Sequence, residues 1–99
     1  MFEWDARKAV SNETKHGVSF REAATVFDDP DRLEASDPAH SVAEPRTRCV
    51  GLSLRGRVLM VAFTYRETTD GQASRLISAR PANRRERATY DRAVPPDRR

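Results

Sequence analysis

The chain has 99 residues, of which 37% are hydrophobic and 33% are charged, so it can build one modest core and not two domains. No apolar run approaches the length of a membrane-spanning helix, and the N-terminus lacks the basic start and apolar stretch of a signal peptide, so we expect a cytoplasmic protein. The single cysteine, Cys49, excludes an internal disulfide and lies in an apolar run, where an inert core thiol is expected.

Positive charge is concentrated at the C-terminal end of the sequence. Residues 1–74 carry ten Lys or Arg against twelve Asp or Glu, whereas residues 75–99 carry eight arginines against three acids. Guanidinium groups bind phosphate through two parallel hydrogen bonds and stay charged when partly buried. The arginine-rich end indicates contact with a polyanion, although a solvated helix face followed by a loose basic tail would have the same composition.

The N-terminal third predicts a short strand and two helices. A strand over residues 2–4 is followed by Asp5, which is suited to cap a helix over residues 6–15 that ends at Gly17. Ser19 and Glu22 have the spacing of a capping box for a second helix. Its apolar residues recur at the spacing of one helical face before Pro30 ends it: Phe20, Ala23, Ala24 and Phe27.

The rest of the chain predicts a strand meander and a final helix. After the acidic, turn-rich stretch 28–37, which holds a possible edge strand at 32–35, strands are expected at 47–54, 57–66 and 75–80. Arg55-Gly56 and Asp70-Gly71 mark the turns between them. Asn83 and Glu86 predict a capping box for a helix over 84–93, and residues 94–99 are expected to form a disordered tail. We therefore predict one α+β domain over residues 2–93. Its antiparallel sheet has three to four main strands, with two N-terminal helices and one C-terminal helix.

Several side chains could act on a phosphodiester. Cleavage of RNA through its 2′-hydroxyl needs a base, cations that stabilise the developing negative charge, and an acid for the leaving oxygen. The two histidines are 24 positions apart and no ligand spacing typical of a metal site is present, so neither a metal nor a cofactor is expected. The candidate residues are Lys8, Lys15, His16, His40, Glu44, Arg46, Arg66, Arg80, Glu86, Arg87 and Tyr90.

Arg66 and Arg80 are distinctive because each ends a predicted strand, where side chains can converge on a shared groove. Glu86 and Tyr90 are four residues apart and therefore share one face of the last helix. Tyr90 could stack on a base there, or it could pack against the sheet. Equally, strand-terminal arginines could simply reach the surface, and a lone histidine is often structural.

The order of several short motifs resembles the BrnT family of ribonuclease toxins over residues 2–90. The motifs in the N-terminal part are Phe2-x-Trp4-Asp5, Lys8-Ala9-x-x-Asn12, Lys15-His16-Gly17-Val18-Ser19-Phe20, Glu22-Ala23 and Val26-Phe27-x-Asp29-Pro30. Those that follow are Asp37-Pro38-x-His40-Ser41-x-x-Glu44-x-Arg46, Val50-Gly51, Phe63-Thr64-x-Arg66, Ile77-Ser78-Ala79-Arg80-x-Ala82 and Glu86-Arg87-x-x-Tyr90.

The resemblance implies a RelE-like fold and a toxin of a type II toxin–antitoxin module, which cleaves RNA without a metal and inhibits translation and growth. It also implies a DNA-binding BrnA-type antitoxin that neutralises the toxin, forms a heterotetramer with it and represses the operon. Glu44 and Glu86 would act as bases or as ion-pair partners of arginines. The matching catalytic positions are Lys15, His16, Arg46, Arg66, Arg80 and Tyr90. Two alternatives are a catalytically inactive binding module within the antitoxin–operator complex and an unrelated small hydrolase.

Overall fold

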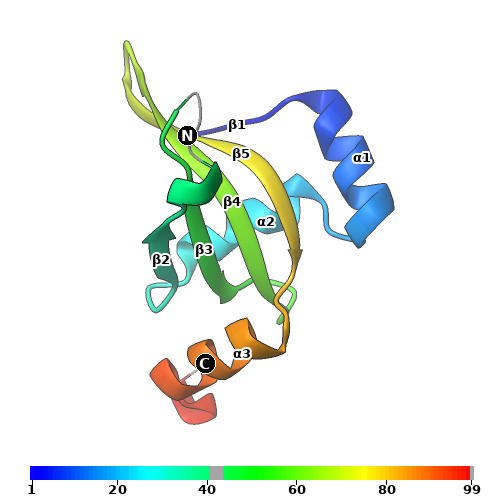
Figure 1. The fold of residues 1–99 in the computed structure, drawn as a ribbon, viewed down its shortest axis with the longest axis vertical. Coiled ribbons are helices and arrows are strands. Elements are labelled where there is room, and N and C mark those ends of the chain that lie inside the picture. The colour runs from blue at the N-terminus through cyan, green and yellow to red at the C-terminus, as the bar shows by residue number, and fades with distance from the viewer. Residues whose placement is uncertain (41–43, 99) are drawn as a thin grey trace.

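A five-stranded sheet organises the fold, which a computed structural model describes for residues 1–40 and 44–98 (Figure 1). The strands lie in the order β1-β5-β4-β3-β2: β1 (Phe2–Glu3), β2 (Leu33–Ser36), β3 (Thr47–Leu52), β4 (Val58–Thr68) and β5 (Gly71–Pro81). The helices are α1 (Ala6–His16), α2 (Phe20–Thr25) and α3 (Arg84–Ala93), with 3-10 turns η1 (Val26–Asp28), η2 (Pro38–His40) and η3 (Pro96–Arg98). Ser41 of the family motif and Arg99 of the tail lie outside the described residues.

Local capping explains where α1 and α3 begin and end. The Asp5 carboxylate accepts hydrogen bonds from the backbone N–H groups of Arg7 and Lys8 at 2.8 and 3.1 Å, and Gly17 ends α1 with a left-handed φ of 69°. In α3, Asn83 and Glu86 form the predicted capping box in both directions. All three predicted helices are confirmed, and the turns at Gly56 and Gly71 have the positive φ expected of them.

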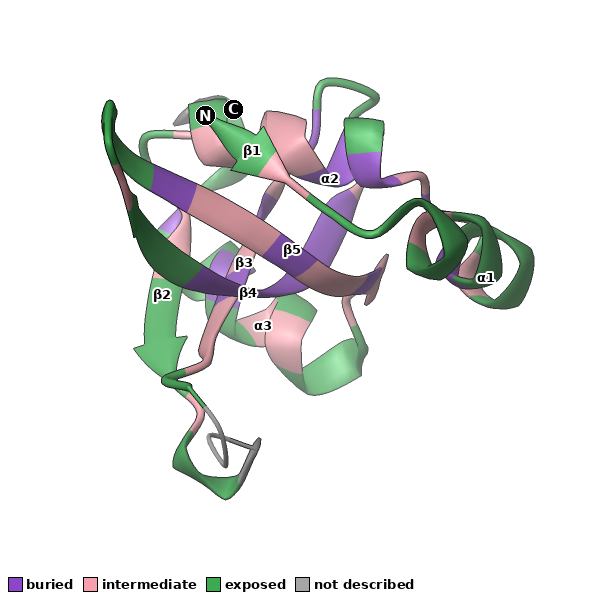
Figure 2. Cartoon of the chain, turned by 90° about the horizontal axis from the view of Figure 1, so that it is seen from above, coloured by how far each residue is buried: buried purple, intermediate pink, exposed green. Residues whose placement is uncertain are grey.

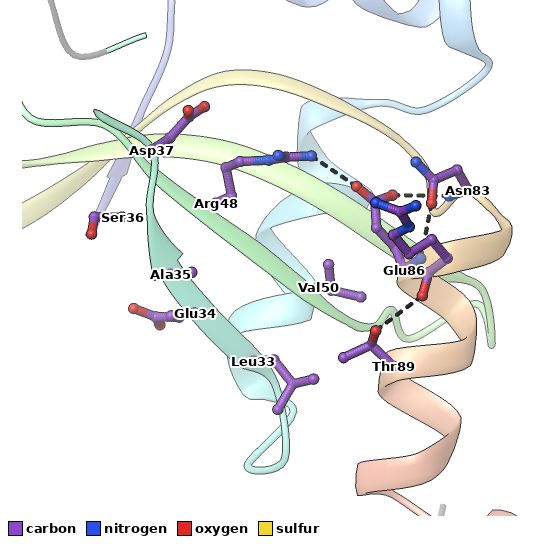
Figure 3. Close-up of a pocket in the computed structure, with 11 residues that line it drawn as sticks. Leu33, Glu34, Ala35, Ser36, Asp37, Arg48, Val50, Asn83, Glu86 and Thr89 are labelled. Atoms are coloured by element: carbon purple, nitrogen blue, oxygen red, sulfur yellow. Dashed lines mark hydrogen bonds and ion pairs between the residues drawn. The ribbon is translucent and has the colours of Figure 1, made fainter. Parts of the chain in front are cut away.

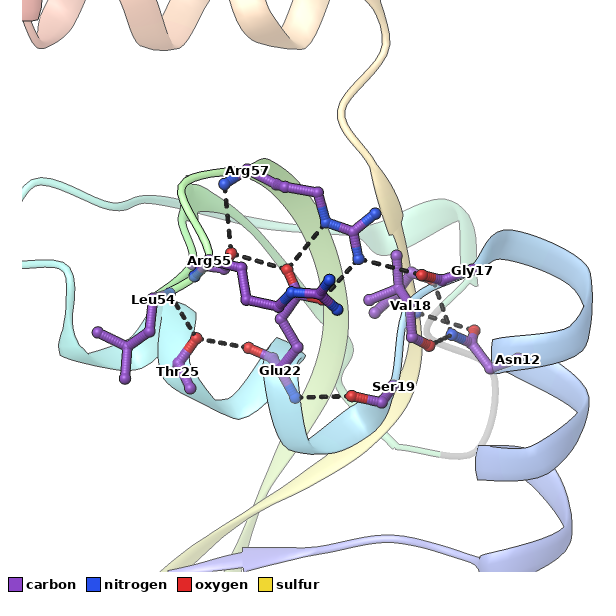
Figure 4. Close-up of polar contacts among 11 residues, drawn as sticks. Asn12, Gly17, Val18, Ser19, Glu22, Thr25, Leu54, Arg55 and Arg57 are labelled. Atoms are coloured by element: carbon purple, nitrogen blue, oxygen red, sulfur yellow. Dashed lines mark hydrogen bonds and ion pairs between the residues drawn. The ribbon is translucent and has the colours of Figure 1, made fainter.

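The second helix is fixed by a contact that sequence spacing did not predict. Ser19 accepts a hydrogen bond from the backbone N–H of Glu22, as expected. The Glu22 carboxylate accepts hydrogen bonds from the Ser53 hydroxyl at 2.8 Å and from Arg57 Nε at 3.0 Å (Figure 4). Despite burial, hydrogen bonds from Arg57 and Ser53 lower the pKa of this carboxyl, so it stays ionised and joins α2 to the β3–β4 turn.

The sheet differs from the prediction in strand number and direction. It has five strands rather than three or four, and β1 runs parallel to β5, with Phe2 opposite Ser74, so the expectation of a purely antiparallel sheet was wrong. Both short strands were expected, at residues 2–4 and 32–35. The two residues of β1 give no pattern from which its pairing partner could be identified, and no tight turn fixes its direction. The antiparallel β2–β3–β4–β5 meander and the α+β class are confirmed.

Helices cover the two faces of the sheet unequally (Figure 2). The main core lies between α2 with η1 and the sheet, and includes Phe20, Val61 and Phe63. A register shift between Ala62 and Phe63 lets both Leu76 and Ala79 reach this core. The buried Cys49 thiol belongs to it as predicted, and burial together with the charge of Glu34 raises its pKa to about 12.

The opposite face is covered by α3 at one end only, around Val58, Tyr90 and Val94. The remainder of this face is the open side of the sheet, and α1 lies beyond the β5 edge (Figures 1 and 2). None of the helices in the described part of the chain is long and apolar enough to cross a membrane.

Candidate active site

A groove of about 450 Å³ separates β2 from α3 on the open side of the sheet (Figure 3). Val50 and Leu33 give it an apolar floor, and polar side chains rise on both walls. Its lining comprises Leu33, Glu34, Ala35, Ser36, Asp37, Arg48, Val50, Asn83, Arg85, Glu86 and Thr89.

Two arginines from different strands converge on one carboxylate at the end of this groove. Arg80 Nη1 and Nη2 donate to the two Glu86 oxygens at 2.7 and 3.0 Å, and Arg48 Nη2 donates to Glu86 Oε2 at 2.8 Å. The side chains of Arg48 and Arg80 remain 42% and 29% exposed, while that of Glu86 is 13% exposed. The cluster therefore presents two accessible guanidinium groups around one largely shielded anion.

Glu86 is held in its ionised form. Burial disfavours its charge, but hydrogen bonds from Arg80 and the Asn83 backbone N–H, with the positive charges of Arg80 and Arg48, lower the pKa of the carboxyl below its usual value. A carboxyl that is ionised at neutral pH has no proton to donate, and a lowered pKa makes it a weak base. Glu86 is therefore suited to orient the two arginines, one of the two roles that the sequence left open.

Strand register explains why the arginines meet. Directly opposite residues on antiparallel strands point to the same face, and Arg48, Ala62 and Ser78 form one such row across β3, β4 and β5. Met60 and Arg80 are paired in the neighbouring row. Arg48 and Arg80 thus emerge on the open side of the sheet, toward α3.

Of the catalytic positions that the resemblance implies, Arg80 takes part in this ion-pair cluster, together with Glu86, which was expected as a base or as an ion-pair partner of arginines. Arg66 lies farther along β4, opposite Ala73, where its Nε contacts the Glu3 carboxylate at 3.3 Å. Arg46 directly precedes β3, and its backbone C=O accepts a hydrogen bond from the backbone N–H of Asp37. Arg46 and Arg66 therefore lie outside the lining of the groove.

Tyr90 is a core residue in the structure. Its side chain is 1% exposed, and its hydroxyl donates a hydrogen bond to Asp29 Oδ2 at 2.5 Å. Asp29 Oδ2 also accepts from the Leu52 backbone N–H at 2.9 Å. The helix places Tyr90 on the same side as Glu86, as predicted, but its ring packs against the sheet instead of facing the groove.

Lys15 and His16 lie in a different hollow, at the edge of the sheet. This hollow of about 200 Å³ separates α1 from β5. It is lined by Lys8, Ser11, Asn12, Lys15, His16, Ile77 and Ser78. Ser78 belongs to the same cross-strand row as Arg48, so the two hollows flank one face of the sheet.

Arg48 was absent from the sequence-derived candidates. Residues two apart on a strand share a face. The Arg46-Thr47-Arg48 pattern could therefore have indicated Arg48 as a candidate wherever Arg46 was one. Its partnership with Glu86, 38 positions away, carries no sequence signal. Among the side chains that the structure describes, no three or more His, Cys, Asp or Glu are arranged to hold a metal ion.

Comparison with known proteins identifies the family. The family model "Ribonuclease toxin, BrnT, of type II toxin-antitoxin system" matches residues 4–86, a segment that includes Arg48, Arg80 and Glu86 but not Tyr90. Among solved structures, the chain is similar to the Brucella abortus ribonuclease toxin BrnT. The two share 23% identity with a TM-score of 0.57, over 85% of this chain and 99% of that chain. No curated protein sequence matches significantly. The chain therefore belongs to the BrnT family of type II toxin–antitoxin ribonuclease toxins.

Proposed function

We propose that this toxin cleaves RNA without a metal ion on the open side of its sheet, with Arg48 and Arg80 binding the scissile phosphate. The convergence of both guanidinium groups on Glu86, at the end of an accessible groove, carries this proposal. The carboxylate orients the arginines before the substrate arrives, which reduces the reorganisation needed during the reaction.

The arginines supply what phosphoryl transfer requires. Attack of the ribose 2′-oxygen on the adjacent phosphate builds negative charge on the phosphate oxygens, and the 5′-oxygen leaves with a proton. Each guanidinium carries five N–H donors, and Arg48 directs only Nη2 at Glu86 among its described contacts. The remaining donors can bind phosphate oxygens while the ion pair stays in place.

We assign proton transfer to His16, because an imidazole can both accept and donate a proton and Glu86 is committed to the arginines. His16 lines the α1–β5 hollow together with Ser78, on the flank of the arginine face. Arg46 and Arg66 would contact the RNA backbone away from the reacting phosphate. Tyr90, which the resemblance placed among the catalytic residues, is assigned a structural role because its ring is buried and its hydroxyl is bound to Asp29.

Membership of a type II toxin–antitoxin family implies an antitoxin partner. We propose that this partner is a DNA-binding BrnA-type protein that neutralises the toxin in the cytoplasm, forms a heterotetramer with it and represses the shared operon. Co-expression with the neighbouring gene would relieve growth arrest if this assignment is correct.

The decisive experiment is cleavage of a labelled RNA by the purified chain and its variants. Arg48→Ala and Arg80→Ala should each lower kcat/KM about 100-fold or more, the usual cost of losing one donor to a developing oxyanion. Arg21→Ala, which removes an exposed arginine on α2, is the matched control and should leave the rate unchanged. Cleavage should persist in EDTA.

Full cleavage by the folded Arg48 and Arg80 variants would contradict the assignment of the site. Loss of activity in EDTA, restored by a divalent cation, would contradict metal independence. A wild-type chain that binds the antitoxin but leaves RNA intact would support the alternative of an inactive binding module.

A further inference from the structure

The hollow between α1 and β5 is positively charged along its whole length. Lys8 and Lys15 are seven residues apart, or about two helical turns, so both project from one side of α1 toward β5. His16 adds an imidazole, and the lining contains no carboxylate. The groove beside α3 differs in this respect, since carboxylates of Asp37 and Glu86 contribute to it together with Arg48 and Arg85.

This hollow borders the arginine face directly. Ser78 lines the hollow and stands in one cross-strand row with Ala62 and Arg48. Two strand spacings separate the backbones of Ser78 and Arg48, which corresponds to about 10 Å. Positive side chains therefore follow one another from α1 across the sheet to the edge of the α3 groove.

We propose that the α1–β5 hollow binds the backbone of single-stranded RNA next to the scissile phosphate, with Lys8 and Lys15 contacting phosphates. The inference rests on the proposed function, because Arg48 and Arg80 define where the scissile phosphate lies. Lysine side chains bind phosphates as mobile point charges without reading bases, so the hollow contributes affinity and substrate length, not sequence preference.

An acidic segment of a protein partner could also meet two lysines. Continuity with the arginine face favours RNA, because a strand bound at Arg48 and Arg80 has to leave the site across one of its flanks. The α3 groove places the Asp37 carboxylate on one flank, whereas the lining of the α1–β5 hollow combines two lysines with no carboxylate and would attract the phosphates.

Binding tests the proposal without requiring cleavage. A fluorescent 2′-O-methyl RNA oligonucleotide of about ten nucleotides, which cannot be cut through the 2′-oxygen, is titrated at several salt concentrations. Lys8→Ala and Lys15→Ala should each weaken binding, and each should reduce the slope of log Kd against log salt by about 0.7. Arg21→Ala removes the same charge from α2 and should leave the slope unchanged.

Cleavage of RNA substrates of different length provides a second test of the proposal. Lys8→Ala should lower kcat/KM for the ten-nucleotide RNA several-fold and leave kcat/KM for a dinucleotide unchanged. An unchanged salt slope, or an equal loss on both substrates, would overturn the proposal. Weakened antitoxin binding with normal RNA binding would also overturn it and assign the hollow to the protein partner. Failure of the proposed function would appear separately, as full activity of Arg48→Ala and Arg80→Ala.

Discussion

Glu86 and Tyr90 stand one turn apart on α3, yet they meet different partners. Glu86 reaches Arg48 and Arg80 at the open face, whereas Tyr90 is buried against the sheet and its hydroxyl reaches Asp29. The helical spacing in the sequence predicts that both share one face of the helix, and it does so correctly. It contains no information on Asp29, which lies 61 positions away and turns the tyrosine hydroxyl into a structural group.

Tyr90→Phe separates a structural from a catalytic role. The variant loses the hydroxyl donor to Asp29, whose carboxylate keeps its bonds from the Leu52 and Asp31 backbone N–H groups. We expect a loss of about 1–2 kcal/mol in the free energy of unfolding, measured by urea denaturation, with kcat unchanged for the folded protein. A large fall in kcat at undiminished stability would make the hydroxyl catalytic after all.

Glu86→Gln tests the ion pairs through their pH dependence. Because the folded-state pKa of Glu86 is lowered, its ionic contribution to stability is fully present above the unfolded-state pKa near 4.3 and is lost as the pH falls through the folded value. The stability advantage of the wild type over Glu86→Gln should therefore be constant near pH 7 and shrink below about pH 4. Glu67→Gln, on the exposed end of β4, is the control and should show no such change. A gap that stays constant down to pH 3 would contradict the ion-pair role.

At the level of elements, α1 protects an open sheet edge through one side chain. Asn12 Nδ2 donates to the Ala79 C=O at 2.8 Å and to the Val18 C=O at 2.9 Å, while its Oδ1 accepts from the Ala79 N–H at 3.0 Å. The amide thereby pairs with β5 as a neighbouring strand would, beyond the two residues that β1 covers. Figure 4 shows Asn12 beside Val18 and the end of α1.

Asn12→Ala should therefore destabilise the fold considerably. It leaves the buried N–H and C=O of Ala79 and the C=O of Val18 without these partners, at a cost of about 3 kcal/mol or more in the free energy of unfolding. For a domain of this size, the melting temperature should fall by more than 10 °C. Ser11→Ala, on the same helix and exposed, should melt within about 2 °C of the wild type. Equal melting temperatures for both variants would refute the edge-pairing role.

How much of the fold and site could be predicted depends on how far apart in the sequence the interacting residues lie. The helices and their caps depend on residues within four positions of one another, and the sequence predicts them almost to the residue. The hairpin turns at Gly56 and Gly71 are equally local. The edge strand at 32–35 was also anticipated, within one residue of β2. The parallel pairing of β1 with β5 and the meeting of Arg48 with Glu86 join distant segments, so they could not be predicted from local patterns.

For the whole molecule, the arginine-rich C-terminal quarter does not form a separate basic tail. Arg75 and Arg80 belong to β5 in the middle of the domain, and the arginines of α3 extend the positive charge along the exposed side of that helix. The chain remains packed as far as Val94, which is 2% exposed and contacts the cluster around Val58 and Tyr90. Packing thus reaches one residue beyond the domain boundary expected from the sequence.

Two truncations can locate the end of the stable unit. Deleting residues 95–99 keeps Val94 in its cluster and should change the melting temperature by no more than about 2 °C. Deleting residues 94–99 also removes the buried valine and its N–H bond to the Tyr90 C=O, which measures 2.8 Å. Burying a valine side chain contributes about 1.5 kcal/mol or more, so the longer deletion should lower the melting temperature by roughly 6 °C or more. Both deletions remove the same two C-terminal arginines, so a difference in RNA binding between the two shortened proteins would reflect folding and not charge.

Equal melting temperatures for the two shortened proteins would place the end of the stable unit before Val94. A large fall in the melting temperature of the 95–99 deletion would place that end within the tail.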